Sequence, residues 1–205
     1  VISASYTRAL LKGVKLAEIL KTLAEVRGTD AVTPLVGMVS YAIIHKHGVA
    51  AFVREAAEAG LDGLIIPDLP VEEAAQTAEL ASGAGLKMIQ LITPTTPRER
   101  ALKIAAATTG FIYYVSVAGI TGERKALPAE LVDNLKWLRG HTDLPVCVGF
   151  GLSSPDQIAE LAPHADGLIV GSAIVRKLAE DRPAAEVVAE IAAIVGKLSV
   201  PLRSR

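Results

Sequence analysis

The chain has 205 residues, of which 51% are hydrophobic and 21% charged, and its formal net charge is -1. This composition is typical of a compact globular protein and excludes disorder, collagen and a coiled coil. A near-neutral charge also argues against a nucleic-acid partner, which selects a basic surface. The longest uncharged apolar run, at about 34–44, is shorter than the roughly 18 residues that cross a bilayer, so no membrane partner is expected.

Helix and strand signals alternate along the chain. A helix over about 16–27 precedes a strand at 35–39, a helix at 49–59 precedes a strand at 64–66, and a helix at 71–82 precedes a strand at 87–92. A capping box formed by Thr96 and Glu99 opens a helix that ends near Gly110, and a strand at 111–115 follows. The remaining elements are a helix at 128–139, a strand at 146–149, a helix opened by a capping box at Ser154 and Gln157, a strand at 166–170, and helices at 173–179 and 184–198.

Six buried strands, each followed by a helix, predict an α/β fold with a parallel sheet. An open doubly wound sheet and a (β/α)8 barrel both fit this alternation, and a barrel typically needs about 250 residues. Because the count is two strands short and the chain begins with a helix, we interpret residues 1–205 as a single barrel domain. Its strands would be equivalent to strands 3–8 of a TIM barrel that lacks about its first two strands in this chain.

Glycines follow the last two predicted strands, at 149–151 and at Gly171. In barrels the loops at this position and the N-terminus of a short helix bind phosphate, because bare N–H groups and the helix dipole favour an anion. The alternative is that these glycines only make turns. The long connection at 116–124 contains two glycines and predicts a lid, with an ordinary surface loop as the alternative.

Five segments then carry a family resemblance: 4–10, 67–73, 119–122, 149–153 and 171–175. In this order and spacing the chain resembles the tryptophan synthase alpha subunit. The resemblance implies a lyase of tryptophan biosynthesis that cleaves indole-3-glycerol phosphate into indole and glyceraldehyde 3-phosphate by a retro-aldol step. It also implies a beta-subunit partner in an alpha2-beta2 complex. Pyridoxal phosphate is expected on that partner and no cofactor in this chain.

The resemblance also assigns site residues. The substrate phosphate is expected at Gly122, Gly151, Gly171 and Ser172, and Thr121 is expected to be the lid residue that steadies a catalytic aspartate. The residues around Asp68 are expected to contact the beta subunit. The indole pocket is expected at Val39, Tyr41, Ile65, Pro67, Leu91, Tyr113, Phe150 and Ile169.

The family's catalytic glutamate and aspartate are expected before Val1, so no catalytic residue is assigned within the chain. Asp68 follows a strand, but a role as turn former is the stronger interpretation. Tyr113, with an ordinary pKa near 10, suits pocket lining better than base catalysis. Glu72 and Glu73 are expected in the first turn of a helix, facing solvent.

Three other features are interpreted as structural. His45 and His47 are expected at the surface where a strand yields to a turn, and not as metal ligands, because no carboxylate accompanies them. Lys87 begins a strand, which disfavours a Schiff-base aldolase, and Trp137 is expected to pack. The single cysteine, Cys147, is expected as a small apolar filler in a strand, and it favours a cytoplasmic location.

Two alternatives to the lyase stay open. One is a catalytically inactive barrel that binds phosphate and activates the beta subunit. The other is a different phosphate-binding barrel enzyme of the same pathway, such as an isomerase or an indole-glycerol-phosphate synthase.

Overall fold

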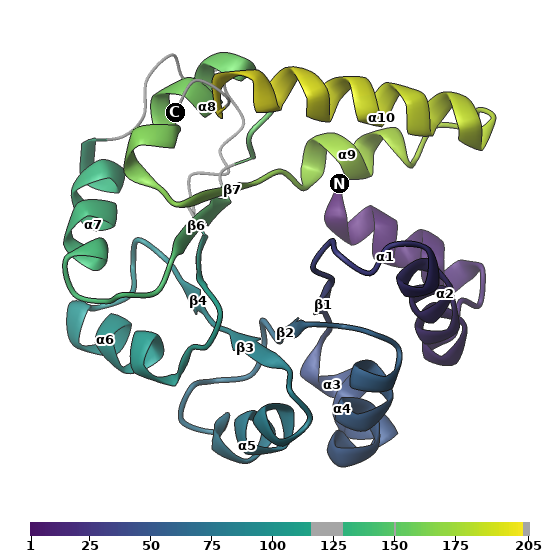
Figure 1. The fold of residues 1–205 in the computed structure, drawn as a ribbon, viewed down its shortest axis with the longest axis horizontal. Helices are drawn as coiled ribbons and strands as arrows, with labels where there is room; N and C mark the ends of the chain where they lie inside the picture. Colours follow the sequence, from purple (N-terminus) through teal and green to yellow (C-terminus); the bar gives the residue numbers. More distant parts are fainter. Residues whose placement is uncertain (116–128, 150, 203–205) are drawn as a thin grey trace. The chain divides into compact units, whose positions relative to one another are not determined.

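The structure is a computed structural model that describes residues 1–115, 129–149 and 151–202 (Figure 1). Contacts between residues divide it into two compact units. The first unit holds residues 1–12, 93–95 and the described residues from 113 onward, and the second holds residues 13–92 and 96–112. Within the described residues, no helix combines the length and apolarity that crossing a membrane requires.

The second unit alternates helices with short parallel strands. Its sheet has the order β1-β2-β3, with Val36 paired to Gly63 and Gly63 paired to Lys87. Its elements are α2 (Leu16–Thr29), β1 (Val36–Met38), α3 (Tyr41–His47), α4 (Val49–Glu58), β2 (Gly63–Ile65), α5 (Ala75–Gly83), β3 (Lys87–Ile89), β4 (Leu91–Ile92) and α6 (Arg98–Ala107).

The first unit follows the same alternation, with β5, β6 and β7 as neighbours in one sheet. Helix α10 packs against α8 and α9 in this unit (Figure 1). Its elements are α1 (Ile2–Leu11), β5 (Ile112–Val115), α7 (Ala129–Arg139), β6 (Val146–Gly149), α8 (Pro155–Leu161), a 3-10 turn (Ala162–His164), β7 (Gly167–Ile169), α9 (Ser172–Lys177), α10 (Ala184–Ser199) and a 3-10 turn (Val200–Leu202).

The core of the second unit lies between its sheet and its helices. Leu64, Ile66 and Met88 belong to one buried cluster with Phe52 and Val53 of α4. Side chains alternate between the two faces of a strand, so this cluster identifies the helix-facing side of β2 and β3. Ile65 and Ile89 therefore point to the other side of the sheet.

The tetrapeptide Asp-Gly-Leu-Ile occurs twice, beginning at Asp62 and at Asp166, and both copies make the same contacts. The backbone N–H of Asp62 donates to the Leu35 carbonyl (2.8 Å), and the Leu35 N–H donates back to the Asp62 carboxylate (2.7 Å). Asp166 makes the equivalent pair of bonds with Val146, both at 2.9 Å. Each aspartate thus ties the start of its own strand to the start of the preceding one.

An arginine from an earlier helix reaches each of these aspartates. Arg139 Nη2 contacts the Asp166 carboxylate at 2.8 Å, and Arg27 Nη2 contacts that of Asp62 at 2.5 Å. Arg27 also donates to the Gly60 carbonyl from Nε (2.9 Å) and Nη2 (2.7 Å), and to the carbonyls of Thr33 (3.0 Å) and Asp30 (3.3 Å). Its guanidinium therefore joins α2 to the loops that precede β1 and β2.

Most predicted elements are confirmed, including β6 at its predicted bounds and the capping box at Ser154, whose hydroxyl accepts the Gln157 N–H. The capping box at Thr96 is wrong. Pro97 takes the N-cap position with an extended ψ of 145°, so the helix starts one residue later and its first turn has no side-chain cap. The strand predicted over 87–92 is divided at Gln90 into β3 and β4.

Two helix predictions also need correction. Helix α5 begins at Ala75, four residues later than predicted, because residues 70–74 form turns with bonds from Glu73 N–H to Pro70 O and from Ala74 N–H to Val71 O. His45 and His47 lie in the last turn of α3, a helix that the sequence analysis missed. Gly48, at φ 95°, separates α3 from α4.

Candidate functional site

The residues expected to form the substrate site lie at the carboxyl ends of strands, where parallel α/β folds bind their ligands. In the second unit Val39 follows β1 and donates its N–H to the Ile65 carbonyl at 3.0 Å. Tyr41 is the first residue of α3, Ile65 ends β2 in a buried position, and Leu91 is half-buried in β4. Pro67 is the exposed member of this group.

Asp68 holds α3 in place. Its carboxylate accepts a hydrogen bond from the Ser40 hydroxyl (2.6 Å) and another from the Tyr41 N–H (2.7 Å). Desolvation opposes ionisation, but these bonds and those from nearby backbone N–H groups outweigh it and keep the pKa of Asp68 below its ordinary value. The interpretation of Asp68 as a local turn former is therefore incomplete, because it joins the loops after β1 and β2. An ionised acceptor already engaged in this way is poorly suited to act as a general base.

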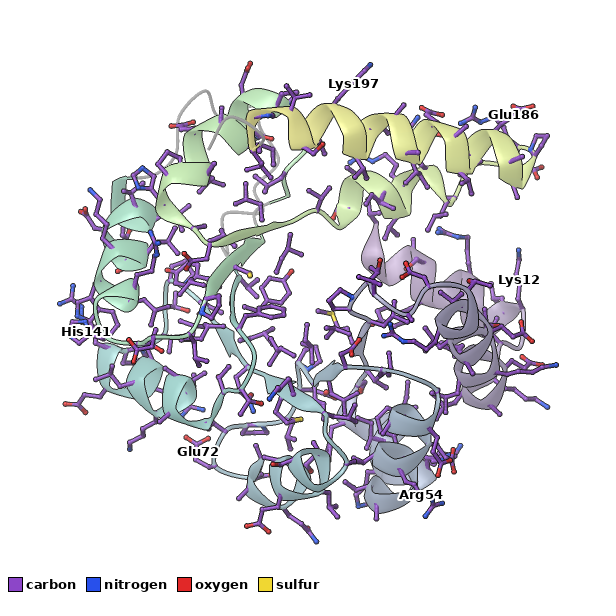
Figure 2. All side chains as sticks on the ribbon, viewed as in Figure 1. Lys12, Arg54, Glu72, His141, Glu186 and Lys197 are labelled. Atoms are coloured by element: carbon purple, nitrogen blue, oxygen red, sulfur yellow. The ribbon has the colours of Figure 1, made fainter. Side chains whose placement is uncertain are left out.

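Glu72 lies between β2 and α5, ahead of the helix in whose first turn it was expected (Figure 2). Arg100 of α6 donates to its two carboxylate oxygens at 2.6 and 3.0 Å. Its own backbone N–H and then Arg100 hold the pKa of Glu72 below its ordinary value. Glu72 and Glu73 are both exposed as expected, but both precede α5, so their placement in its first turn is wrong, and Glu72 is in addition paired with Arg100.

In the first unit Tyr113 of β5 lies over Gly149 of β6. A Cβ atom at Gly149 would come within 2.6 Å of the Tyr113 ring, so only glycine permits this approach. Desolvation raises the pKa of Tyr113 above its ordinary value, which keeps the phenol protonated. Tyr113 can therefore line a pocket or donate a hydrogen bond, and it is unsuited to base catalysis.

The glycines expected to bind phosphate follow two strands that pair in parallel register, with Gly149 opposite Ile169. Gly151 and Gly171 each lie two residues beyond this pair. Gly151 has φ +61°, a conformation that favours glycine, and no described atom lies within 4 Å of a Cβ built at either position. Ser172 is the half-buried first residue of α9.

Three of the predicted site residues, Thr121, Gly122 and Phe150, lie outside the described residues. The sequence analysis missed two residues that contact the site, Ser40 and Arg100. Ser40 is the N-cap residue of α3, and its position before Tyr41 and Ile44 is the signal that could have located this helix. Arg100 meets Glu72 over 28 residues of sequence, and no local pattern could have revealed that pairing.

His45 and His47 are exposed as expected. The premise that no carboxylate accompanies them is wrong, because His47 Nε2 contacts the Glu55 carboxylate at 2.8 Å. No three His, Cys, Asp or Glu side chains gather into a possible metal site in the described part of the chain. Lys87 begins β3, and Trp137 is half-buried in α7 against His141, with 4.6 Å between ring centroids. Cys147 is half-buried in β6.

Short parallel strands followed by helices, with the candidate site residues after their carboxyl ends, define an α/β protein. The solved structures that the chain matches identify its class as the α/β barrel. The chain matches the tryptophan synthase a2b2 complex of Pyrococcus furiosus with a TM-score of 0.89 and 37% identity, over 96% of this chain and 79% of that chain. It matches the tryptophan synthase alpha chain of Legionella pneumophila with a TM-score of 0.86 and 32% identity, over 98% of this chain and 75% of that chain.

The sequence comparisons give the family. The model for the tryptophan synthase alpha chain matches residues 1–201. A tryptophan synthase alpha chain of Rhodopirellula baltica is 53% identical over 183 residues, which are 88% of this chain and 66% of that protein. The chain belongs to the tryptophan synthase alpha chain family, and it spans just under two thirds of the length of this relative.

Proposed function

We propose that the protein containing this chain is a carbon–carbon lyase that cleaves indole-3-glycerol phosphate into indole and glyceraldehyde 3-phosphate. Membership of the family supports the reaction. The observation that carries the proposal is the pair of glycines, Gly151 and Gly171, two residues beyond paired positions of β6 and β7. Their open backbone fits an anion such as the substrate phosphate.

The remaining site residues are proposed in the roles that the family resemblance gives them. Gly122 and Ser172 would complete the phosphate site, and Thr121 would belong to a lid. The indole ring would lie among the mostly apolar side chains of Val39, Tyr41, Ile65, Pro67, Leu91, Tyr113, Phe150 and Ile169. A flat heteroaromatic ring requires such a lining.

Retro-aldol cleavage also needs a base and an acid. The base takes the proton of the glycerol hydroxyl next to the ring, the carbon–carbon bond breaks, and the electron pair passes into the indole ring as the acid protonates carbon 3. Asp68 and Glu72 are already engaged with Ser40 and Arg100. We therefore propose that a glutamate and an aspartate on a segment preceding Val1 perform these transfers.

We further propose a beta-subunit partner that receives indole and carries pyridoxal phosphate, with no cofactor on this chain. The a2b2 complex of the Pyrococcus furiosus protein supports an assembly of this kind. A single barrel domain and a cytoplasmic location also stay predictions.

The test uses the full-length gene product together with a beta subunit. Indole release from indole-3-glycerol phosphate is the expected result. Gly171→Asp places a side chain and a negative charge where the phosphate would approach, and should weaken substrate binding at least about 10-fold. Gly28→Asp on α2, where a Cβ also meets no described atom, is the matched control and should leave binding unchanged.

Two outcomes would contradict the proposal. An intact protein that releases no indole but stimulates the beta subunit would establish the non-catalytic alternative. Unchanged substrate affinity in Gly171→Asp would remove the phosphate assignment while leaving the lyase reaction in place.

A further inference from the structure

A cavity with a volume of about 270 Å³ lies in the second unit, beside the Pro67–Val71 segment and α6. Ile66, Leu69 and Ile104 are buried in its wall, with exposed fractions of 3%, 5% and 7%. Ile66 belongs to the cluster on the helix-facing side of the sheet, whereas Ile65 of the proposed indole pocket points to the other side. The cavity therefore lies mainly on the helix-facing side of the sheet, and it adjoins the proposed substrate site through Pro67 and Leu91.

Gln90 gives this cavity its polar group. It lies at the break between β3 and β4, two residues after Met88, and it borders the cavity with only 6% of its surface exposed. Among the described residues its side-chain amide has no hydrogen-bond partner. The polar atoms of this amide are not among the described side-chain atoms that are fully buried without a partner, so the amide is open to the cavity. A ligand or water in the cavity would supply the missing bonds.

The charged groups beside the cavity are already paired. Arg100 is engaged by both carboxylate oxygens of Glu72, and the carboxylate of Asp68 accepts hydrogen bonds from Ser40 and Tyr41. A charged ligand would have to break one of these pairs. The Gln90 amide instead offers a donor and an acceptor side by side, which a neutral amide or azole matches with an acceptor and a donor.

We propose that this cavity is a binding site for a small uncharged molecule that has one amide-like or azole group and an apolar ring. The polar group pairs with Gln90, and the ring lies against Ile66, Leu69 and Ile104. Sites for drug-sized ligands occupy about 300–1,000 Å³, so this cavity accepts a single ring system. The site does not depend on the lyase reaction.

Benzamide is the probe for this site, and the full-length protein is titrated with it while the NMR signals of the Gln90 side-chain NH₂ are followed. We expect saturable binding with a dissociation constant on the order of 1 mM, as for a ligand of this size. Acetophenone, which keeps the ring and the acceptor but lacks the NH₂ donor, should bind at least about 10-fold more weakly.

Gln90→Met keeps the length of the side chain and removes the amide. It should weaken benzamide binding at least about 10-fold without lowering Tm, since the amide has no hydrogen-bond partner among the described residues. Gln76→Met on the exposed face of α5 is the matched control and should bind benzamide like the parent.

Three results would overturn the proposal. The first is binding of benzamide that does not saturate at concentrations on the order of 10 mM. The second is equal binding of benzamide and acetophenone to the parent protein. The third is a Tm of Gln90→Met that is clearly lower than that of the parent protein. The last would show that the amide holds the fold together. The comparison of the two probes on the parent protein remains decisive even if the variant fails to fold.

Discussion

Arg27 offers the sharpest test of how the second unit is held together, because its guanidinium contacts four groups from two parts of the chain, 30–33 and 60–62. It donates to the carbonyls of Gly60, Thr33 and Asp30 and contacts the carboxylate of Asp62. Arg27→Met keeps most of the aliphatic side chain and removes all of these bonds.

The size of the effect follows from exposure. Hydrogen bonds to charged groups contribute about 1.5–3 kcal/mol when well buried. The Arg27 side chain is 21% exposed and that of Asp62 is 53% exposed, so water can replace part of what is lost. We expect Arg27→Met to lower the free energy of unfolding by about 2–3 kcal/mol and Tm by about 4–12 °C, at 2–4 °C per kcal/mol for a chain of this size.

The assay is urea-induced unfolding followed by far-UV circular dichroism, with the slope m fitted for each protein. Arg54→Met is the matched control, labelled in Figure 2 on α4. Arg54 is 64% exposed, and its contacts with Glu58 and Glu55 are long, at 3.9 and 4.0 Å, so the expected loss is below about 0.5 kcal/mol. Equal losses in the two variants would refute the reasoning.

Three further predictions concern single contacts. The Thr33 hydroxyl and then backbone N–H groups lower the pKa of Asp30 to about 2. Its stabilising contribution is therefore present above its unfolded pKa and lost as pH falls toward 2, and Thr33→Val should raise that pKa in a carboxyl NMR titration. A Cβ at Gly167 would lie 2.7 Å from Cys147 Sγ, so Gly167→Ala should destabilise by about 1–3 kcal/mol in urea unfolding, and adding Cys147→Ala should restore much of the loss. Asp68→Ala should increase hydrogen exchange at the start of α3, and unchanged exchange would contradict its assigned role.

Local signals predicted the elements whose boundaries depend on local chemistry. The capping box at Ser154 forms because Pro155 takes the first helical position and leaves Ser154 extended as N-cap. The similar pattern at Thr96 fails because Pro97 itself becomes the N-cap. Since proline's fixed φ suits both positions, the sequence alone could not distinguish them.

The site was predictable where it consists of glycines and apolar strand ends, and unpredictable where distant parts of the chain meet. Gly151 and Gly171 stand out in the sequence because each follows a predicted strand, and the structure places both two residues beyond paired positions of β6 and β7. Their role in binding phosphate is a proposal. The partners of Asp68 and Glu72 lie 27 or 28 residues away. Gln90 was not predicted as a site residue because the pattern over 87–92 indicates one continuous strand, in which a single amide side chain has no special position.

The two Asp-Gly-Leu-Ile segments show that the same local hydrogen bonds can contribute differently to stability when their surroundings differ. Asp62 and Asp166 make the same backbone bonds, yet Arg27 adds several carbonyl contacts, whereas the contact described for Arg139 is the single one to Asp166 at 2.8 Å. With side chains 40% and 34% exposed, this pair should contribute only about 0.5–1 kcal/mol. Arg139→Met should therefore destabilise less than Arg27→Met in urea unfolding, while Asp166→Ala should exceed Arg139→Met because it also frees a backbone N–H. A loss in Arg139→Met as large as in Arg27→Met would mean that the aspartate bond, and not the carbonyl contacts, is the main source of stability at both positions.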